Sequence, residues 1–382
     1  MISFIVRRLL YSIPVLLGVI FVVFTLSRVI PGDPCRSALG ERATDAICDA
    51  YNERYGLNKA VIPGVYKLRG AFEVRIDDVP ATLLDNQFVA YLGQLSTGDL
   101  GHSLKFGIPV TELLVSRLPT TIELTVLALL FAVVVGMTLG LVAAYRRNSK
   151  IDVLTMVWAN VGVSIPVFVL GLFLAYIFAI VLRDTFLSLP PSGRLSSGVR
   201  VVPLAETFGL THVTGGPRML LDFFSNMYVL NSLVTGQWNA LIDALRHLVL
   251  PTIALGTIPL AIIARMTRSS LLDVLGLDYI RTARAKGLGQ RLVVFRHGMR
   301  NALLPVVTVI GLSLGGLLSG AVLTETVFNL SGVGLTFFEA ITGRDYVVIQ
   351  GFTLVIAILF LVINLLVDIS YAWLDPRIRL SR

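Results

Sequence analysis

Long apolar runs constrain this sequence more than any other feature, because a run of about 20 apolar residues without a central charge can cross a bilayer as a helix. The first run, residues 9–30, follows Arg7 and Arg8 and ends at the sequence PGDP. The apolar core of a secretory signal peptide has only about 7 to 15 residues and ends at a small-residue cleavage site. This run is longer and stops at proline, which favours an uncleaved span.

Five further runs follow the first. They cover residues 120–145, about 151–182, about 248–264, about 302–324 and 351–374. In the third run we expect Pro166 to kink the helix, since proline removes one backbone hydrogen bond. The chain is 55% hydrophobic and only 15% charged, and its mean hydropathy is +0.80. These values are typical of an all-α integral membrane protein, here with six transmembrane helices.

The basic residues gather at the ends of the runs and therefore predict the orientation. Short loops rich in Arg and Lys stay in the cytoplasm, whereas long loops are translocated largely regardless of charge. With six spans, four basic groups fall on one side: Arg7 with Arg8, Arg146 and Arg147 with Lys150, the cluster from Arg265 to Arg300, and Arg377 with Arg379. Both termini are then cytoplasmic. The net charge of +8 follows this membrane pattern, and we expect no nucleic-acid partner.

The two cysteines, Cys35 and Cys48, lie in one polar loop that this orientation places outside the cell. They either form a single disulfide or remain as two thiols. Two cysteines are too few for a disulfide framework, and the four histidines are scattered along the chain. We therefore expect no metal site.

The sequence lacks the signature residues of several functional classes. The phosphate-binding pattern G-x-x-x-x-G-K-[ST] is absent, so we expect no ATP binding by that route. The middle thirds of the runs contain no ionisable residue, which disfavours an ion-driven carrier. No serine–histidine or aspartate pair of an intramembrane protease is visible within the runs. We expect no catalytic residues in this chain.

The stretch DYIRTARAKGLGQR, residues 278–291, interrupts the apolar pattern with a short basic helix. Asp278 suits the helix N-cap, and Gly287 suits its C-terminal end. Tyr279, Ala283 and Gly287 share one row at helical spacing, and arginines lie beside it. One interpretation is a helix held on anionic lipid. The small residues of the row favour docking onto a protein instead.

The motifs of the whole chain resemble a known family. They include RRLLYSIPVLLGV, PGDP, RYGLNK, GDLGHS, RLPTTIEL, LPPSGR, ALRHLVLP, TARAKGLG, RHGMRNALLPVVT, GAVLTETVF, RDYVVIQG and LDPRIR. The sequence is similar to permease subunits of ABC importers, in particular the dipeptide, oligopeptide and nickel branch. The general importer pattern begins Glu-Ala-Ala and has a later glycine, where this chain has Arg281, Thr282, Ala283 and Gly287. The missing glutamate resembles the peptide branch.

The resemblance implies the type I ABC importer permease fold in a prokaryotic cytoplasmic (inner) membrane. It also implies a coupling helix that docks on an ATPase and includes Tyr279, Arg281, Thr282, Ala283, Arg284, Ala285, Lys286 and Gly287. The implied partners are a homologous second permease in a heterodimer, two ATP-binding subunits and an extracytoplasmic substrate-binding protein. ATP and Mg belong to the ATPases, and this chain holds no cofactor. The expected cargo is a short peptide; nickel, glycans or another small solute is the alternative, and a non-transport channel or scaffold is a more distant one.

The expected organisation has three parts: residues 1–34 form the N-terminal span, residues 35–118 an extracytoplasmic region, and residues 119–382 the permease core. The core includes an extracytoplasmic insertion at about 195–231 and a cytoplasmic coupling loop at 273–302. The insertion and the stretch 61–85 fit the family pattern poorly. Each either contacts the substrate-binding protein or is a decoration without a transport role.

Two further sets of residues are candidates for packing or for the pathway. Glycines at four-residue spacing let helices approach closely, either within the subunit or against the partner permease. They are Gly136, Gly140, Gly311, Gly315, Gly316 and Gly320. Glu123 and Glu325 lie near the expected outer ends of their spans. There they either meet a substrate amine at the pathway mouth or are solvated or hydrogen bonded.

Overall fold

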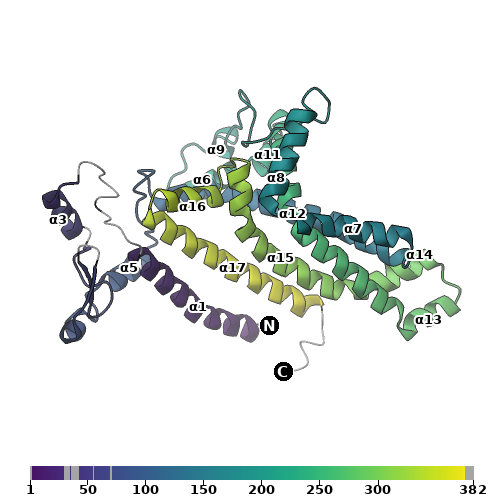
Figure 1. Cartoon of the computed structure of the whole chain (residues 1–382), viewed down its shortest axis with the longest axis horizontal. Coiled ribbons are helices and arrows are strands. Elements are labelled where there is room, and N and C mark those ends of the chain that lie inside the picture. The colour runs from purple at the N-terminus through teal and green to yellow at the C-terminus, as the bar shows by residue number, and fades with distance from the viewer. Residues whose placement is uncertain (1, 30–34, 36–42, 55, 69–70, 375–382) are drawn as a thin grey trace. The chain divides into compact units, whose positions relative to one another are not determined.

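The computed structural model describes residues 2–29, 35, 43–54, 56–68 and 71–374, and most of them are helical (Figure 1). The chain divides into two compact units. The first comprises Met1–Leu114 and Phe337–Leu359, and the second comprises Val115–Thr336 and Phe360–Arg382. The PGDP sequence and the basic residues Arg377 and Arg379 lie outside the described residues.

The first unit joins a long apolar helix, α1 (Ile2–Val29), to a polar lobe. The lobe contains α3 (Asp45–Arg54), an antiparallel hairpin of β1 (Val65–Leu68) and β2 (Ala71–Val74), the 3₁₀ turn η2 (Ile76–Asp78), α4 (Val79–Thr82) and α5 (Gln87–Ser96). Asn86 caps α5 by accepting a hydrogen bond from the Val89 amide, as the N-cap preference of asparagine predicts. Cys35 and Cys48 are joined by a disulfide, so of the two alternatives for these residues the structure has the bridge.

Aromatic packing holds the lobe to α1. Phe24 is fully buried, and its ring lies 5.2 Å from Phe88 and 5.6 Å from Tyr91, both on α5. Arg28 adds a 2.9 Å hydrogen bond to Gln87. Aromatic pairs in such geometry add about 0.5–1.5 kcal/mol each beyond their burial. The polar lobe is therefore anchored at the C-terminal end of α1.

The second unit is a helical bundle. Three of its helices are shared with the first unit. The helices are α6 (Val110–Tyr145), α7 (Lys150–Ser164), α8 (Val167–Ala175), the π-helix η3 (Tyr176–Val181), α9 (Leu204–Thr207), α10 (Gly215–Ser225), α11 (Tyr228–Thr235), α12 (Trp238–Leu275), α13 (Asp278–Ala285), α14 (Gln290–Leu292), the π-helix η4 (Val293–Gly298), α15 (Met299–Val327), α16 (Val333–Thr342) and α17 (Tyr346–Leu374). The first turn of α6, the end of α16 and the start of α17 fall in the first unit. Within the second unit, α12 and α15 pack along one another (Figure 1).

Among the described residues, five helices are long and apolar enough to cross a membrane. They include Val6–Leu26, Val110–Tyr145, Trp238–Leu275, Gln290–Leu318 and Tyr346–Ile369. A sixth span results if α7 and the segment Val167–Val181 count as one bent pair. The helices α6 and α12 extend well beyond their apolar runs. A helix can continue past the apolar residues as long as its backbone hydrogen bonds are kept and its polar ends reach water.

The third run is broken rather than kinked. The axes of its two halves differ by 101°. Ile165 is extended, with φ −100° and ψ 127°, and Pro166 precedes the first residue of α8. Proline disfavours helical backbone at the residue before it, which explains why α7 stops at Ser164.

Close packing in the second unit accounts for most of the small residues of the spans. A Cβ at Gly136 would lie 2.7 Å from the Leu260 carbonyl oxygen, and one at Gly140 would overlap the Ala264 carbonyl. Both positions therefore bring α6 directly against α12. In α15, Gly311 contacts Val367, and Gly315 contacts Phe360.

The last two glycines of α15 differ from one another. Gly320 lies against Leu255 of α12, whereas a Cβ at Gly316 would meet no atom within 4 Å. Five of the six glycines thus pack within the subunit, and only Gly316 leaves open space for a neighbour.

An ion pair and a further hydrogen bond connect α7 to α12. Arg268 forms two hydrogen bonds with Asp152, of 2.7 and 2.8 Å, and Arg265 donates to Asn160 at 2.9 Å. The bidentate geometry of an arginine on a carboxylate fixes both position and orientation. The basic residues after the fourth run thus also fasten two helices together.

Candidate functional site

The basic stretch between α12 and α15 folds back on itself. The helix α13 begins at Asp278, and its N-cap is Leu277, which makes no side-chain cap hydrogen bond. The expectation that Asp278 caps this helix is therefore wrong. Its carboxylate instead lies 3.3 Å from the Arg281 guanidinium, one turn along, and both groups are exposed.

Glycine ends α13 as the sequence predicts. Gly287 has a φ of +79°, and its amide donates to the Arg284 carbonyl at 2.9 Å. The next amide, of Leu288, donates to the Ala283 carbonyl. A residue with a Cβ is strained at this φ, so the position calls for glycine.

One face of α13 packs against the chain itself. Ile280 is fully buried and Ala283 is 9% exposed, and both pack on Val293 of η4. The Tyr279 hydroxyl donates to the His297 carbonyl at 3.2 Å and accepts from Asn301 at 2.7 Å. Of the predicted row Tyr279, Ala283 and Gly287, only Ala283 is buried, whereas Tyr279 is 39% exposed and Gly287 is exposed as well. Docking through this row stays a prediction.

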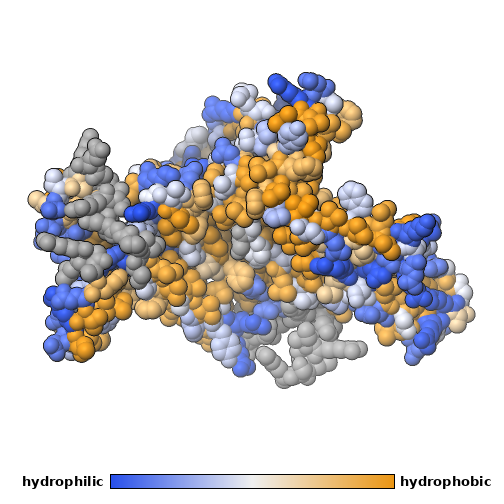
Figure 2. All heavy atoms as spheres, in the orientation of Figure 1, coloured by the Kyte–Doolittle hydropathy of each residue, from blue (hydrophilic) through white to orange (hydrophobic). Residues whose placement is uncertain are grey.

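The outward face of α13 is polar and basic. The exposed residues of α13 and its C-cap are Asp278, Tyr279, Arg281, Thr282, Arg284, Ala285 and Lys286. Figure 2 shows hydrophilic residues gathered over α13 and α14, next to the apolar surface of α7. This end of the unit offers a basic surface that includes the small residue Ala285.

Glu123 anchors the segment between α8 and α12. Its carboxylate accepts hydrogen bonds from the amides of Val229 and Leu230, at 2.7 and 3.1 Å, and lies 3.4 Å from Arg194. The amides belong to the first turn of α11, where the helix dipole favours a negative charge. The Arg194 and Glu123 side chains are only 12% and 6% exposed.

Arg194 is itself held from two further directions. It donates to the Asn226 carbonyl at 2.6 Å, and its guanidinium lies 3.6 Å from the centre of the Tyr228 ring. Burial lowers the pKa of Arg194, while Tyr228 and Glu123 favour its charged form. Sequence reasoning missed Arg194, although a charged residue that directly follows the turn sequence LPPSG was a usable signal.

Glu325 plays a similar role between α15 and α16. It is fully buried, accepts from the Thr121 hydroxyl at 2.6 Å and accepts from the Leu335 amide at 3.0 Å. Thr121 in turn accepts from the Val333 amide at 2.9 Å. Glu123 and Glu325 are thus buried and hydrogen bonded to the protein. The role at a pathway mouth stays a prediction.

Among the described residues, no three His, Cys, Asp or Glu side chains come close enough to hold a metal ion. The candidate site therefore consists of the exposed basic surface of α13 and two buried, hydrogen-bonded carboxylates, those of Glu123 and Glu325. Such an arrangement can transmit movement between helices.

Comparisons with known proteins cover the whole chain. Residues 136–380 match the family described as the binding-protein-dependent transport system inner membrane component, and residues 1–125 match its N-terminal part. The chain is 42% identical to the dipeptide transport system permease protein of Alkalihalophilus pseudofirmus over 379 residues, which cover 99% of this chain and 100% of that protein.

Two further relatives are as similar. A di/tripeptide transport system permease protein of Pseudomonas aeruginosa is 42% identical over 383 residues, which cover 100% of both chains. The dipeptide transport system permease protein of Escherichia coli is 41% identical over 379 residues, which cover 99% of both chains.

Proposed function

The chain belongs to the family of binding-protein-dependent transport system inner membrane components, and we propose that it forms half of the pathway of an ATP-driven importer of short peptides. It is a permease subunit of an ABC transporter and not itself an enzyme. The peptide cargo is supported by three relatives over 40% identical along their full lengths, all named for dipeptide or di/tripeptide transport. No Walker sequence is present, so ATP and Mg would be bound by partner subunits.

We further propose six spans with both termini in the cytoplasm of a prokaryotic cell, in the type I importer arrangement. The basic flanks of the apolar runs support this orientation. In it, α7 and α8 form one broken span, and α13 and the basic surface around it face the cytoplasm. The disulfide-bonded lobe and the segment from Arg183 to Gln237 then lie outside.

The partners proposed are a homologous permease, two ATPases and an extracytoplasmic substrate-binding protein. The exposed residues of α13 would contact an ATPase, and the movement would pass through Ile280 and Val293 into α12 and α15. The observation that carries this proposal is the division of α13 into a buried face packed on η4 and an exposed basic face. A helix fixed on one side and open on the other can dock without losing its position.

The test changes a small residue of the exposed face. Replacement of Ala285 by Trp adds a large side chain to that face without touching Ile280 or Ala283. We expect the Ala285→Trp complex to insert normally but to lose copurifying ATPase and peptide uptake at least tenfold, which corresponds to about 1.4 kcal/mol. Ala81→Trp, at an exposed alanine of α4 in the outer lobe, is the matched control and should retain both. Normal uptake by Ala285→Trp would disprove docking through this face.

A further inference from the structure

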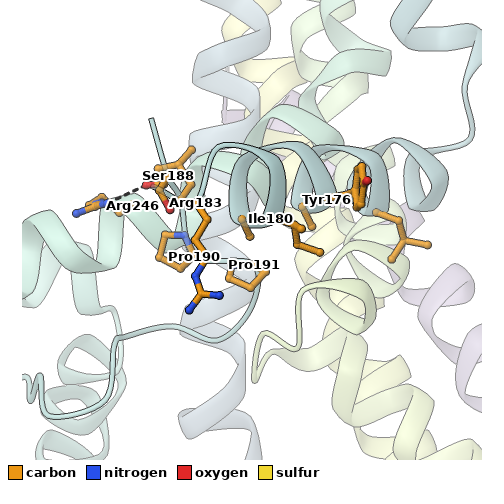
Figure 3. A pocket seen from close by; sticks show the side chains of 11 residues that line it. Tyr176, Ile180, Arg183, Ser188, Pro190, Pro191 and Arg246 are labelled. Carbon is orange, nitrogen blue, oxygen red and sulfur yellow. Dashed lines mark hydrogen bonds between the residues drawn. The ribbon is translucent and has the colours of Figure 1, made fainter. Parts of the chain in front are cut away.

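A groove of about 580 Å³ opens beside α8 in the second unit (Figure 3). One wall is the apolar side of α8 and η3, with Leu172, Tyr176 and Ile180. The opposite wall is the turn that contains Pro190 and Pro191. The volume is within the range of pockets that bind small molecules, about 300–1,000 Å³.

Two arginines lie at this apolar groove. Arg246 of α12 donates to the Ser188 carbonyl at 2.8 Å, and Arg183 extends from the end of η3 past the two prolines (Figure 3). Both are exposed. Among the described residues, neither guanidinium lies within 4.0 Å of a carboxylate.

Within the described part of the chain, the lining of the groove contains no acidic residue. Asp243 interacts electrostatically with Arg246 from outside the lining. Asp243, one turn before Arg246, accepts two 2.7 Å hydrogen bonds from the amide and hydroxyl of Ser196 and lies 3.7 Å from His247. Asp184 follows Arg183 in sequence, but it is exposed and does not line the groove. The groove therefore combines an apolar wall with excess positive charge.

The groove lies where two membrane segments meet their polar flanks. The apolar segment Val167–Val181 ends just before Arg183, and Arg246 precedes the apolar part of α12. A strip of exposed apolar residues leads from the groove along α8 and η3: Leu172, Phe173, Tyr176 and Ile180 are 55–64% exposed. Tyrosine and arginine are typical of the level of lipid headgroups.

We propose that the groove binds an acidic phospholipid in the leaflet opposite α13. Arg183 and Arg246 hold its phosphate, and an acyl chain lies along the exposed strip of α8. The planar guanidinium matches the phosphate oxygens in a bidentate manner. Basic pockets between membrane helices recognise acidic headgroups in this way. A zwitterionic lipid offers the same acyl chains, but its ammonium group faces two positively charged arginines.

The test is native mass spectrometry of the full chain in its complex. The complex is titrated with phosphatidylglycerol and, separately, with phosphatidylcholine of the same acyl chains. We expect phosphatidylglycerol to be preferred. We expect Arg183→Gln to weaken its binding about tenfold, as for the loss of a charge-assisted hydrogen bond. Among the described residues, the Arg183 side chain makes no hydrogen bond or ion pair, so this change removes no such interaction from the fold.

Two further variants separate the contributions. Arg200→Gln changes an 80% exposed arginine of the same outer segment and should leave lipid binding unchanged. Ala179→Phe fills the groove without changing its charge, and we expect it to reduce phosphatidylglycerol binding as well. Because Arg246 also holds the turn at Ser188, the decisive comparison is between Arg183→Gln and Arg200→Gln.

Three results would overturn the proposal. Equal binding of the two lipids removes the role of the arginines. Full competition by inorganic phosphate at millimolar concentration identifies a free-anion site instead. Loss of lipid binding only when the second permease is present identifies the groove as a protein interface.

Discussion

Glu123 and Glu325 show what a carboxylate needs in order to be buried in this bundle. Each accepts hydrogen bonds from at least two donors that belong to other parts of the chain. An unpaired buried carboxylate would cost several kcal/mol, so these donors decide where each glutamate can lie. The sequence placed both near the ends of spans, but it did not show the partners because they are distant in the chain.

The Arg194 anchor predicts a local loss of order on mutation. Arg194→Gln leaves Glu123 buried without its cation, and removal of one partner of a buried pair typically costs about 3–5 kcal/mol. We expect faster proteolysis of the segment between Pro203 and Asn226, with the spans intact. Arg200→Gln is the control, since its pair with Glu206 is exposed and 3.9 Å long. Equal proteolysis of the two variants would contradict the anchor.

The two glycines after α13 differ in what they tolerate. Gly287→Ala forces a Cβ into left-handed backbone, which costs about 1–2 kcal/mol. We expect faster amide hydrogen exchange at Leu288, whose bond to Ala283 closes the helix. Gly289 has φ −61° and ψ 143° with open space around it, so Gly289→Ala should exchange as the parent does. A bulky residue at Gly287 would therefore test backbone strain rather than docking.

At the scale of elements, the residue pattern predicted α13 but not which of its side chains are buried. A short basic helix with small residues was correctly inferred, and its buried residues are Ile280 and Ala283, whereas Tyr279 and Gly287 of the predicted row are exposed. The usable signal was Ile280, the only aliphatic residue larger than alanine in α13, which shares a face with Ala283 at a spacing of three. The ends of α6 and α12 were also out of reach, since they depend on hydrogen bonds and on neighbouring segments rather than on hydropathy.

The glycines of the spans predict which helix contacts are intolerant of bulk. Gly140→Val would overlap the Ala264 backbone, so we expect α6 and α12 to separate, at a cost of about 1–3 kcal/mol. Thermal unfolding of the purified subunit should show the loss. Gly316→Val meets open space and should leave the isolated subunit as stable as the parent. If the second permease packs on α15 at Gly316, the Gly316→Val variant will form less of the heterodimer with that permease. A lower thermal stability of the isolated Gly316→Val subunit would contradict the open space found at this position.

For the molecule as a whole, the apolar runs predicted the location of every candidate span, because membrane length and hydropathy are local properties. They located the bend at Pro166 but did not predict its size, 101°. Among the described residues, no candidate span lies between α1 and α6, as the polar sequence there predicts. The helices of the polar lobe, its hairpin and its aromatic anchor on α1 were not foreseen, since they depend on contacts between distant residues.

The lobe carries apolar side chains that an isolated polar domain does not need. Ile76 and Leu84 are 78% and 77% exposed, and we propose that they contact the substrate-binding protein. Burial of two such side chains contributes about 1.5–3 kcal/mol each. We expect the Ile76→Asp, Leu84→Asp double variant to weaken binding of that protein at least tenfold and to slow uptake. The control, Thr97→Asp, adds charge at another exposed position of the unit; unchanged affinity in the double variant would reject this contact.

The length of α12 has a mechanical consequence. Its 38 residues form a lever about 57 Å long, at a rise of about 1.5 Å per residue. One end of α12 follows α11, which binds Glu123. Two residues separate its other end from α13. If this lever stays straight, a tilt of only about 5° displaces its far end by about 5 Å, one helical turn. Pro251 and Pro259 are both buried within α12. If the helix bends at either proline, the same tilt displaces its far end less.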